Sequence, residues 1–340
     1  MKKFLNILIG GLGYKSLIHN QWKNSLFLES HSNQFLNLPD NIIKISSQSE
    51  GCGGDMYCGQ EEFKKIKEEV LSIVNDYDYV VITAGFGGGT GSGFTLGLIE
   101  LLEQNAKSYI IIANTLKKDE YYKVQSISQY DLIIQTLDRS CLYVLIDSKQ
   151  IEKELCLYDL KANEYEKYFS NQNIKLIETI SSIVEAGIDL KDIKETLKSG
   201  LTYFSYSSSE SNNIKYIADN LFFDKFSKIK TRHIDNYILS YTNDITQNHK
   251  NYLLERIDQN TNSTSFKTAD NYADIYCLIG GSVRQQTVTN SSTNDLAYGY
   301  KQAQTAGVNP VYTQDSSVTN SLAYGYKQFN KQSLDKIFWL

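Results

Sequence analysis

Short apolar runs recur along the first half of the chain and alternate with longer segments of helical spacing. The runs contain mostly branched and large apolar side chains, which is typical of strands buried on both faces. Between residues 60 and 74, apolar positions instead recur every three or four residues, as on one face of a helix. Strands are predicted over residues 4–9, 25–28, 42–45, 79–83, 109–113 and 142–146. This alternation predicts an α/β fold with a doubly wound, mostly parallel sheet.

The second half begins with a long helical stretch over residues 163–185 and continues with shorter elements. The pattern predicts helices over 189–198, 212–226 and 246–257, and strands over 201–206, 237–241 and 274–279. We therefore expect a first α/β domain at 1–162, a central helix at 163–187, a smaller second α/β domain at 188–283, and a tail at 284–340.

The tail differs from the rest of the chain in composition. Of the last 56 residues, 24 are Ser, Thr, Asn or Gln, which predicts a flexible segment. The sequence LAYGYKQ occurs twice, at 296–302 and 322–328, and two copies are too few for a solenoid. The chain closes on Ile337, Phe338, Trp339 and Leu340. These side chains could dock to a partner, fold back on the body or assist lateral packing between copies.

Composition and charge exclude several classes of protein. Lys and Arg number 34 against 39 Asp and Glu, a net charge of −5, so broad contact with nucleic acid is not expected. The apolar start resembles a signal peptide, but Asn6 interrupts it and Lys15 soon follows, which favours a buried first strand. No apolar stretch reaches about 20 residues, so no membrane span is expected. We expect a cytoplasmic protein with reduced cysteines; Cys52 and Cys58 lie close in sequence but lack further zinc ligands.

The strongest candidate for chemistry is a glycine-rich segment between a predicted strand and a predicted helix. It reads Gly87, Gly88, Gly89, Thr90, Gly91, Ser92 and Gly93. Glycines let backbone N–H groups approach an anion, the helix start adds unpaired donors, and the two hydroxyls add more, so phosphate is the ligand that suits it best. The segment matches neither a Walker P-loop nor the dinucleotide fingerprint. A purely structural turn is the alternative.

This segment resembles the signature loop of the tubulin/FtsZ superfamily at all seven positions, and the weaker resemblance extends over about residues 4–283. The resemblance implies a GTPase that binds GTP or GDP with Mg²⁺ and polymerises head to tail with itself. The chain's small size and residues 49–54 look most like the plasmid and phage branch, TubZ-like or PhuZ-like. That branch implies partition of DNA or positioning of particles in a bacterial host, with an adaptor protein bound through the tail.

The resemblance also implies nucleotide contacts at other positions. Phosphate contacts are expected from Gly10, Gly11 and Gly13, with Lys15 as a further candidate, and γ-phosphate contacts are expected from Gly51 and Gly53. Ribose contacts are expected from Glu120, with Lys123 in place of the usual Arg, and from Asp147. Base contacts are expected from Phe169 and Asn173, although Asn171 competes and an ordinary helix face remains the alternative.

Two carboxylates follow the predicted central helix. Asp189 and Asp192 begin a helix, where they suit an N-cap and a first-turn acid. Their spacing also resembles the family's catalytic loop, with Gly187 in place of Asn. In that interpretation the acids position the attacking water. The ends of the central helix are about 20–25 Å or more apart, so the acids would act on the nucleotide of the next subunit.

Two other functions compete with this interpretation. A nucleotide-binding homologue without efficient hydrolysis would explain the altered first loop and the missing Asn. A dinucleotide-dependent oxidoreductase is suggested by Gly11–Ser16, one residue short of the fingerprint, and by Glu29 at the end of the next strand. The oxidoreductase interpretation leaves Gly87–Gly93 unexplained.

Overall fold

The computed structural model describes residues 3–18, 24–116, 124–150, 153, 162–185, 188, 190–197, 200–208, 213–222, 232, 234–242, 245–261, 265–271 and 275–281. All of them belong to one compact unit, residues 1–286; residues 287–340 form a second unit. Asp189, Glu120 and the whole predicted tail lie outside the described residues.

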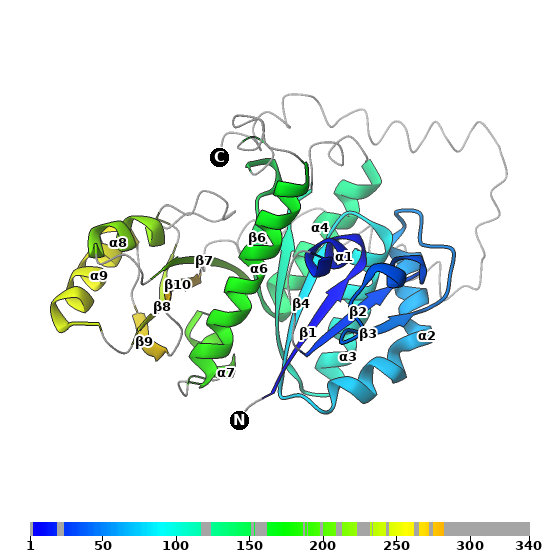
Figure 1. Ribbon diagram of the computed structural model, residues 1–340, viewed down its shortest axis with the longest axis horizontal. Coiled ribbons are helices and arrows are strands. Elements are labelled where there is room, and N and C mark those ends of the chain that lie inside the picture. Colours follow the sequence, from blue (N-terminus) through cyan, green and yellow to red (C-terminus); the bar gives the residue numbers. More distant parts are fainter. Residues whose placement is uncertain are drawn as a thin grey trace. The chain divides into compact units, whose positions relative to one another are not determined.

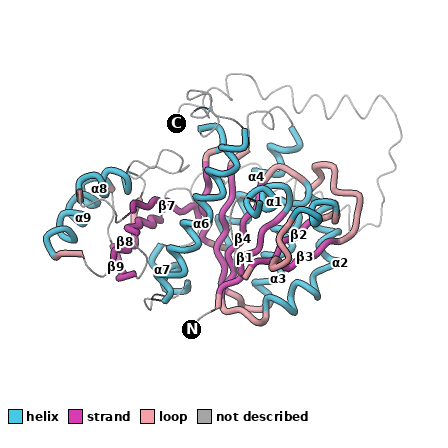
Figure 2. The backbone as a smooth tube through the Cα atoms, in the orientation of Figure 1, coloured by secondary structure: helices cyan, strands magenta, loops and turns pink. Residues whose placement is uncertain are grey.

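The described strands form one sheet, with strand order β3-β2-β1-β4-β5-β6-β7-β10-β8-β9 (Figures 1 and 2). Their bounds are β1 Phe4–Ile9, β2 Ser25–Glu29, β3 Ile43–Ser46, β4 Tyr79–Gly85, β5 Ser108–Asn114, β6 Leu142–Ile146, β7 Gly200–Ser208, β8 Asn236–Thr242, β9 Ser265–Asn271 and β10 Ile275–Gly281. The pairings from β3 to β7 and between β8 and β9 are parallel, whereas β10 is antiparallel to both β7 and β8. The predicted doubly wound, mostly parallel sheet is confirmed.

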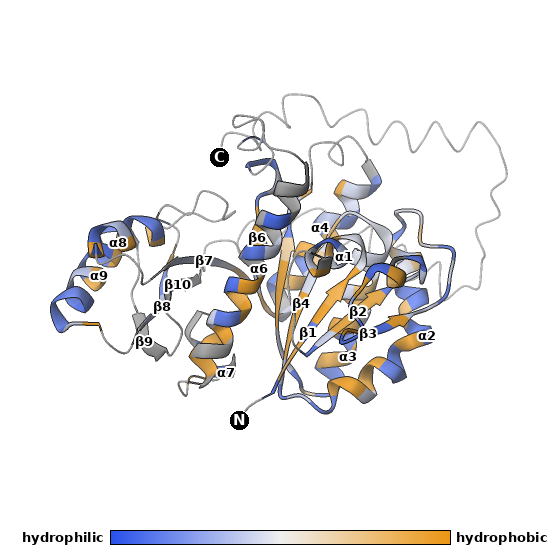
Figure 3. Cartoon of the chain, in the orientation of Figure 1, coloured by the Kyte–Doolittle hydropathy of each residue, from blue (hydrophilic) through white to orange (hydrophobic). Residues whose placement is uncertain are grey.

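Helices cover both faces of this sheet. Their bounds are α1 Gly10–Ile18, η1 Asn33–Asn37, α2 Met56–Val74, α3 Gly89–Gln104, α4 Val124–Ser140, α6 Ala162–Glu185, α7 Leu190–Leu197, α8 Ile214–Phe222 and α9 Gln247–Asn260. Side chains along β1 alternate between the two layers: Ile7 belongs to the core cluster that includes buried residues of α2, α3 and α4, and Leu8 to the cluster that includes residues of α1, α6 and α7. Figure 3 shows the apolar strands between helices that carry polar residues outward.

Two elements differ from the sequence prediction. Helix α4 was not predicted because Ser126 and Gln129 occupy its buried face ahead of Ile133 and Leu137, so its apolar period is hidden. Strand β9 is rich in polar residues, and it is held by backbone pairing with β8 at the edge of the sheet. In the part of the chain that the structure describes, no helix is both long and apolar enough to span a membrane.

Candidate functional site

Two helices begin side by side at the carboxyl ends of the neighbouring parallel strands β1 and β4. Helix α1 starts at Gly10, directly after β1, and helix α3 starts at Gly89, a few residues after β4 (Figure 1). Gly10 has φ +66°, and a Cβ placed on it would lie 3.3 Å from the backbone nitrogen of Gly91. Two helix N-termini therefore bring their unpaired N–H groups and partial positive charges to one place, which suits an anion.

The glycines of the signature loop have different surroundings. A Cβ on Gly88, the residue before α3, would meet nothing within 4 Å. At Gly89, Gly91 and Gly93 a Cβ would instead come within 2.1–2.6 Å of other atoms, among them the backbone oxygens of Gly85 and Met56. A Cβ on Gly87 would lie 2.3 Å from the Leu116 side chain, so only Gly88 in this loop combines an open approach with the start of the helix.

The two hydroxyls of the loop are also placed differently. Ser92 is fully buried, and its Oγ accepts a hydrogen bond of 3.1 Å from the backbone N–H of Gly87. This hydrogen bond holds the loop together from inside, and the role of Ser92 as a phosphate donor stays a prediction. Thr90 is half-buried, and its Cβ lies 3.7 Å from the position of a Cβ on Gly10. Thr90 is thus the hydroxyl nearer to the two helix starts.

The segment after β3 is held against the end of β2. The carbonyl oxygen of Ser30 accepts hydrogen bonds from the hydroxyls of Ser46, Ser47 and Ser49, at 3.2, 3.1 and 3.1 Å. Gly51 and Gly53 follow with φ +100° and +53°, and a Cβ on Gly53 would meet nothing within 4 Å. This segment ends at Asp55, which caps α2 by accepting a hydrogen bond from the N–H of Tyr57. The predicted γ-phosphate segment therefore connects the sheet edge to the start of α2.

Cys52 joins this segment to the signature loop. Its Cβ lies 2.6 Å from the position of a Cβ on Gly89, so the side chain packs directly against the start of α3. Burial, together with a hydrogen bond to Cys58, raises the pKa of the Cys52 thiol from 9.0 to about 12. At neutral pH the sulfur is therefore protonated and packs as a small apolar group.

The remaining predicted nucleotide contacts are distributed over the same edge and the central helix. Gly11 is open, while Gly13 packs against Leu8, where a Cβ would come within 2.7 Å of backbone. Lys15 lies half-buried on α1. Asp147 follows β6 and accepts a hydrogen bond from the N–H of Gln150, at 3.2 Å. Phe169 and Asn173 lie in α6, as does the exposed Asn171.

Helix α7, which carries Asp192, lies near the end of the sheet where β1 begins, whereas α1 and its glycine loop begin where β1 ends (Figure 1). Asp192 occupies the first turn of α7, and its neighbour Ile193 is buried in the same cluster as Phe4 and Tyr79, which begin β1 and β4. The other end of α6 packs on α1, where the Ser170 hydroxyl donates to the carbonyl oxygen of Ser16 at 2.8 Å. Since α6 has 24 residues, its ends are about 35 Å apart.

Sequence reasoning gave no role to Ser30 or Asn114 at the glycine-loop edge, and it considered Glu29 only for a dinucleotide site. Glu29 is 3% exposed and accepts hydrogen bonds from both the N–H and the hydroxyl of Ser30. Ser30 in turn bonds Thr90. Asn114 ends β5, and its buried Oδ1 has no hydrogen-bond partner among the described residues. The position of these residues at strand ends is the signal that could have identified them.

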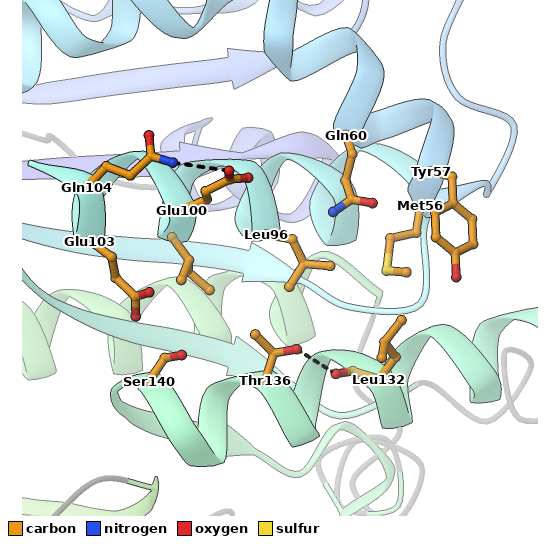
Figure 4. A pocket seen from close by; sticks show the side chains of 11 residues that line it. Met56, Tyr57, Gln60, Leu96, Glu100, Glu103, Gln104, Leu132, Thr136 and Ser140 are labelled. Atoms are coloured by element: carbon orange, nitrogen blue, oxygen red, sulfur yellow. Dashed lines mark hydrogen bonds between the residues drawn. The ribbon is translucent and has the colours of Figure 1, made fainter. Parts of the chain in front are cut away.

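A separate groove of about 520 Å³ runs between α2, α3 and α4 (Figure 4). Its apolar lining residues include Met56, Leu96 and Leu132, and its acidic lining residues are Glu100 and Glu103. These carboxylates would repel a polyphosphate, so the groove does not suit a nucleotide. Among the described residues, His, Cys, Asp and Glu side chains form no cluster of three that could hold a metal ion.

Comparison with known proteins agrees with this geometry. Residues 25–154 match the model of the tubulin/FtsZ family GTPase domain. The chain is 28% identical over 140 residues to the tubulin-like protein TubZ of Bacillus cereus, which covers 39% of this chain and 32% of that protein. The match therefore spans about a third of the relative's length. Over 52 residues the chain is 42% identical to cell division protein FtsZ 1 of Methanocaldococcus jannaschii, covering 15% of this chain and 14% of that protein.

Solved structures share the fold. A GTPγS-bound protofilament of CetZ2 from Haloferax volcanii superposes with a TM-score of 0.68 at 16% identity, covering 90% of this chain and 98% of that one. A tail-truncated TubZ from Clostridium botulinum phage c-st superposes with a TM-score of 0.59 at 15% identity, covering 82% and 91%. Residues 25–154 thus match the GTPase domain of the tubulin/FtsZ family, and the chain is similar to TubZ over part of its length.

Proposed function

We propose that this protein is a filament-forming GTPase that hydrolyses GTP at the contact between head-to-tail copies of itself. The observation that carries the proposal is the pair of helix N-termini, α1 and α3, at the carboxyl ends of β1 and β4. Donors from both helices converge on one point, and Gly11, Gly53 and Gly88 leave open space around it. A polyphosphate fits this cradle, because its charge meets two helix dipoles and its oxygens meet backbone N–H groups.

A guanine nucleotide with Mg²⁺ is the ligand that we propose. The triphosphate would lie against Gly10, Gly11 and the loop Gly87–Gly93, with Gly51 and Gly53 near the γ-phosphate. Asp147 and Glu120 would bind ribose, and Phe169 and Asn173 would bind the base. Mg²⁺ prefers hard oxygen ligands, and the half-buried Thr90 hydroxyl is an oxygen of that kind beside Gly10. The ion would neutralise phosphate charge during hydrolysis.

The carboxylates that position the attacking water are proposed to come from a neighbouring copy. Asp192 follows the C-terminal end of α6, and the α6 residue that contacts α1, Ser170, lies 15 residues before that end, about 22 Å away, so its own nucleotide is out of reach. A second copy stacked on the loop edge would bring Asp189 and Asp192 to the γ-phosphate. This contact joins two different surfaces and does not close on itself, so it generates a filament. Hydrolysis would then accompany assembly.

The cellular role that we propose is partition of plasmid or phage DNA, or positioning of particles. Similarity to TubZ supports this role. With a net charge of −5, the chain is poorly suited to hold DNA directly, so an adaptor bound through residues 284–340 is proposed to make that contact.

The test is phosphate release from GTP measured against protein concentration. The wild type should show a threshold, since only assembled copies have complete sites, and Asp192→Ala should lower the rate per subunit about 100-fold or more. Glu195→Ala, on the same helix but paired with Lys191 at the surface, is the matched control and should keep the wild-type rate. Hydrolysis proportional to concentration, without a threshold, would show that each copy has a complete site.

A second candidate is a homologue that assembles on GTP but hydrolyses it poorly. Gly187, in place of the family's Asn, favours this candidate. Sedimentation with GTP and with a slowly hydrolysed analogue separates the two: an efficient GTPase forms transient polymer with GTP and lasting polymer with the analogue. Equal and lasting polymer in both would favour the second candidate.

A further inference from the structure

A chain of hydrogen bonds runs from a buried carboxylate to the signature loop. Glu29 Oε1 accepts from the backbone N–H of Ser30 at 2.8 Å and from the Ser30 hydroxyl at 3.1 Å. The Ser30 Oγ lies 2.8 Å from the Thr90 Oγ1. Glu29 and Ser30 are 3% and 1% exposed, so water does not compete for these bonds. Glu29, Ser30 and Thr90 are called the relay below.

The relay fixes the direction in which the Thr90 hydroxyl points its hydrogen. A serine hydroxyl has a single hydrogen, and Ser30 gives it to Glu29. In the contact between the two hydroxyls, Thr90 must therefore be the donor and Ser30 the acceptor. The Thr90 hydrogen is directed into the protein, and its oxygen keeps its two lone pairs for a ligand.

The Glu29 carboxylate accepts two hydrogen bonds from Ser30, one from its N–H and one from its hydroxyl, and it therefore orients the relay.

An oxygen that presents a lone pair is complementary to a cation and not to a phosphate oxygen. A phosphate oxygen is itself an acceptor and would need the hydrogen that Thr90 has already given to Ser30. Thr90 lies beside Gly10 and is followed by Gly91, and the backbone N–H groups of these glycines can donate to a phosphate. The site therefore separates its tasks: backbone N–H groups face the phosphates, and the Thr90 oxygen faces their counter-ion.

We propose that Thr90 binds the divalent cation of the nucleotide through its hydroxyl oxygen, directly or through one bound water, and that Ser30 and Glu29 are positioning residues that hold this oxygen in its accepting orientation. The proposal rests on the proposed function, since it assigns a role within the same site.

The test uses Mn²⁺ in place of Mg²⁺ and measures its binding by the loss of the free-ion electron paramagnetic resonance signal, with the protein saturated by GTPγS. Binding of GTPγS without metal is measured separately, by calorimetry in EDTA. The variants are Thr90→Val, which removes the hydroxyl at constant shape, and Ser30→Ala, which removes its acceptor. Thr90→Ser retains the hydroxyl, and Thr136→Val, in α4, is the control for loss of a threonine hydroxyl elsewhere.

We expect Thr90→Val to weaken Mn²⁺ binding about 10-fold or more and to change metal-free GTPγS affinity less than about twofold. Ser30→Ala should weaken Mn²⁺ binding by a smaller factor in the same direction, while Thr90→Ser and Thr136→Val should match the wild type. If Thr90→Val instead weakens metal-free GTPγS binding and leaves Mn²⁺ affinity unchanged, Thr90 donates to phosphate and the assignment is wrong. Failure of the folded wild type to bind any guanine nucleotide would overturn the proposed function, and this assignment with it.

Discussion

Gly88 and Gly91 stand three residues apart in the same loop, yet an added methyl group would meet different surroundings at each. At Gly88 the space is open, and the backbone φ of −100° is accessible to alanine. At Gly91 the methyl would lie 2.1 Å from the carbonyl oxygen of Gly85. We expect Gly91→Ala to lower the free energy of unfolding by about 3 kcal/mol, and Gly88→Ala by less than about 1 kcal/mol.

Gly88→Ala, the variant with the smaller expected loss of stability, should show the clearer loss of nucleotide affinity. The methyl of Gly88→Ala would occupy the space through which we propose that phosphate approaches the start of α3, so affinity for GTPγS should fall at least about 10-fold in a protein that is still folded. Urea unfolding and calorimetry measure the two quantities. A folded Gly88→Ala protein with wild-type affinity would place the phosphates elsewhere.

Cys52 makes a prediction about alkaline pH. Burial raises its pKa from 9.0 to about 12, so the folded state retains a proton that the unfolded chain releases above pH 9. The stabilisation is complete below pH 9 and is lost as the pH rises toward 12. Between pH 8 and pH 10 this thiol should cost the wild type about 1.4 kcal/mol of unfolding free energy. Cys52→Ala should lack this part of the decline; identical pH slopes for both proteins would contradict it.

At the scale of single residues, the sequence identified the glycine loop of the proposed phosphate site but not the separate tasks that we propose within it. The seven-residue motif identified the loop, because it combines glycines with two hydroxyl side chains between a strand and a helix. Whether Thr90 bonds Ser30 depends on a contact between the end of β2 and the loop, 60 residues apart in sequence. No local pattern carries that information.

Helices α2 and α3 meet through glycines, which makes their packing unusually close. A Cβ on Gly59 of α2 would lie 2.3 Å from the carbonyl oxygen of Gly89, the first residue of α3. Within a helix, Gly→Ala ordinarily stabilises by about 1 kcal/mol. Here we expect Gly59→Ala to destabilise by about 2–3 kcal/mol, because the helices must separate. Ser72→Ala, on the exposed side of α2, should change stability by less than about 0.5 kcal/mol in the same thermal or urea unfolding experiment. A more stable Gly59→Ala protein would mean that the contact is looser than described.

At the scale of elements, the strands of the parallel core and the central helix followed from apolar periodicity. Each of these elements buries its own apolar side chains, so the spacing of apolar residues in its sequence indicates which face is buried. Helix α4 buries Ser126 and Gln129, and β9 is fixed by backbone pairing. Neither element could therefore be predicted from the spacing of its apolar residues. The placement of Asp192 opposite the glycine loops depends on the length of α6, and the sequence also predicted this long helix.

For the whole molecule, the proposed mechanism predicts that two inactive proteins can restore one another. In a head-to-tail filament, each site combines the glycine loops of one copy with Asp192 of the next. Gly88→Ala copies lack a proper cradle but retain Asp192, while Asp192→Ala copies bind nucleotide but lack the acid. Mixed in equal amounts and assembled together, they should form complete sites at about a quarter of all contacts, and phosphate release should rise toward that fraction of the wild-type rate. A double variant carrying both changes, mixed with the wild type, is the control for dilution. If the mixture stays as inactive as its parts although sedimentation shows both proteins in the polymer, then the acid and the cradle must belong to the same copy.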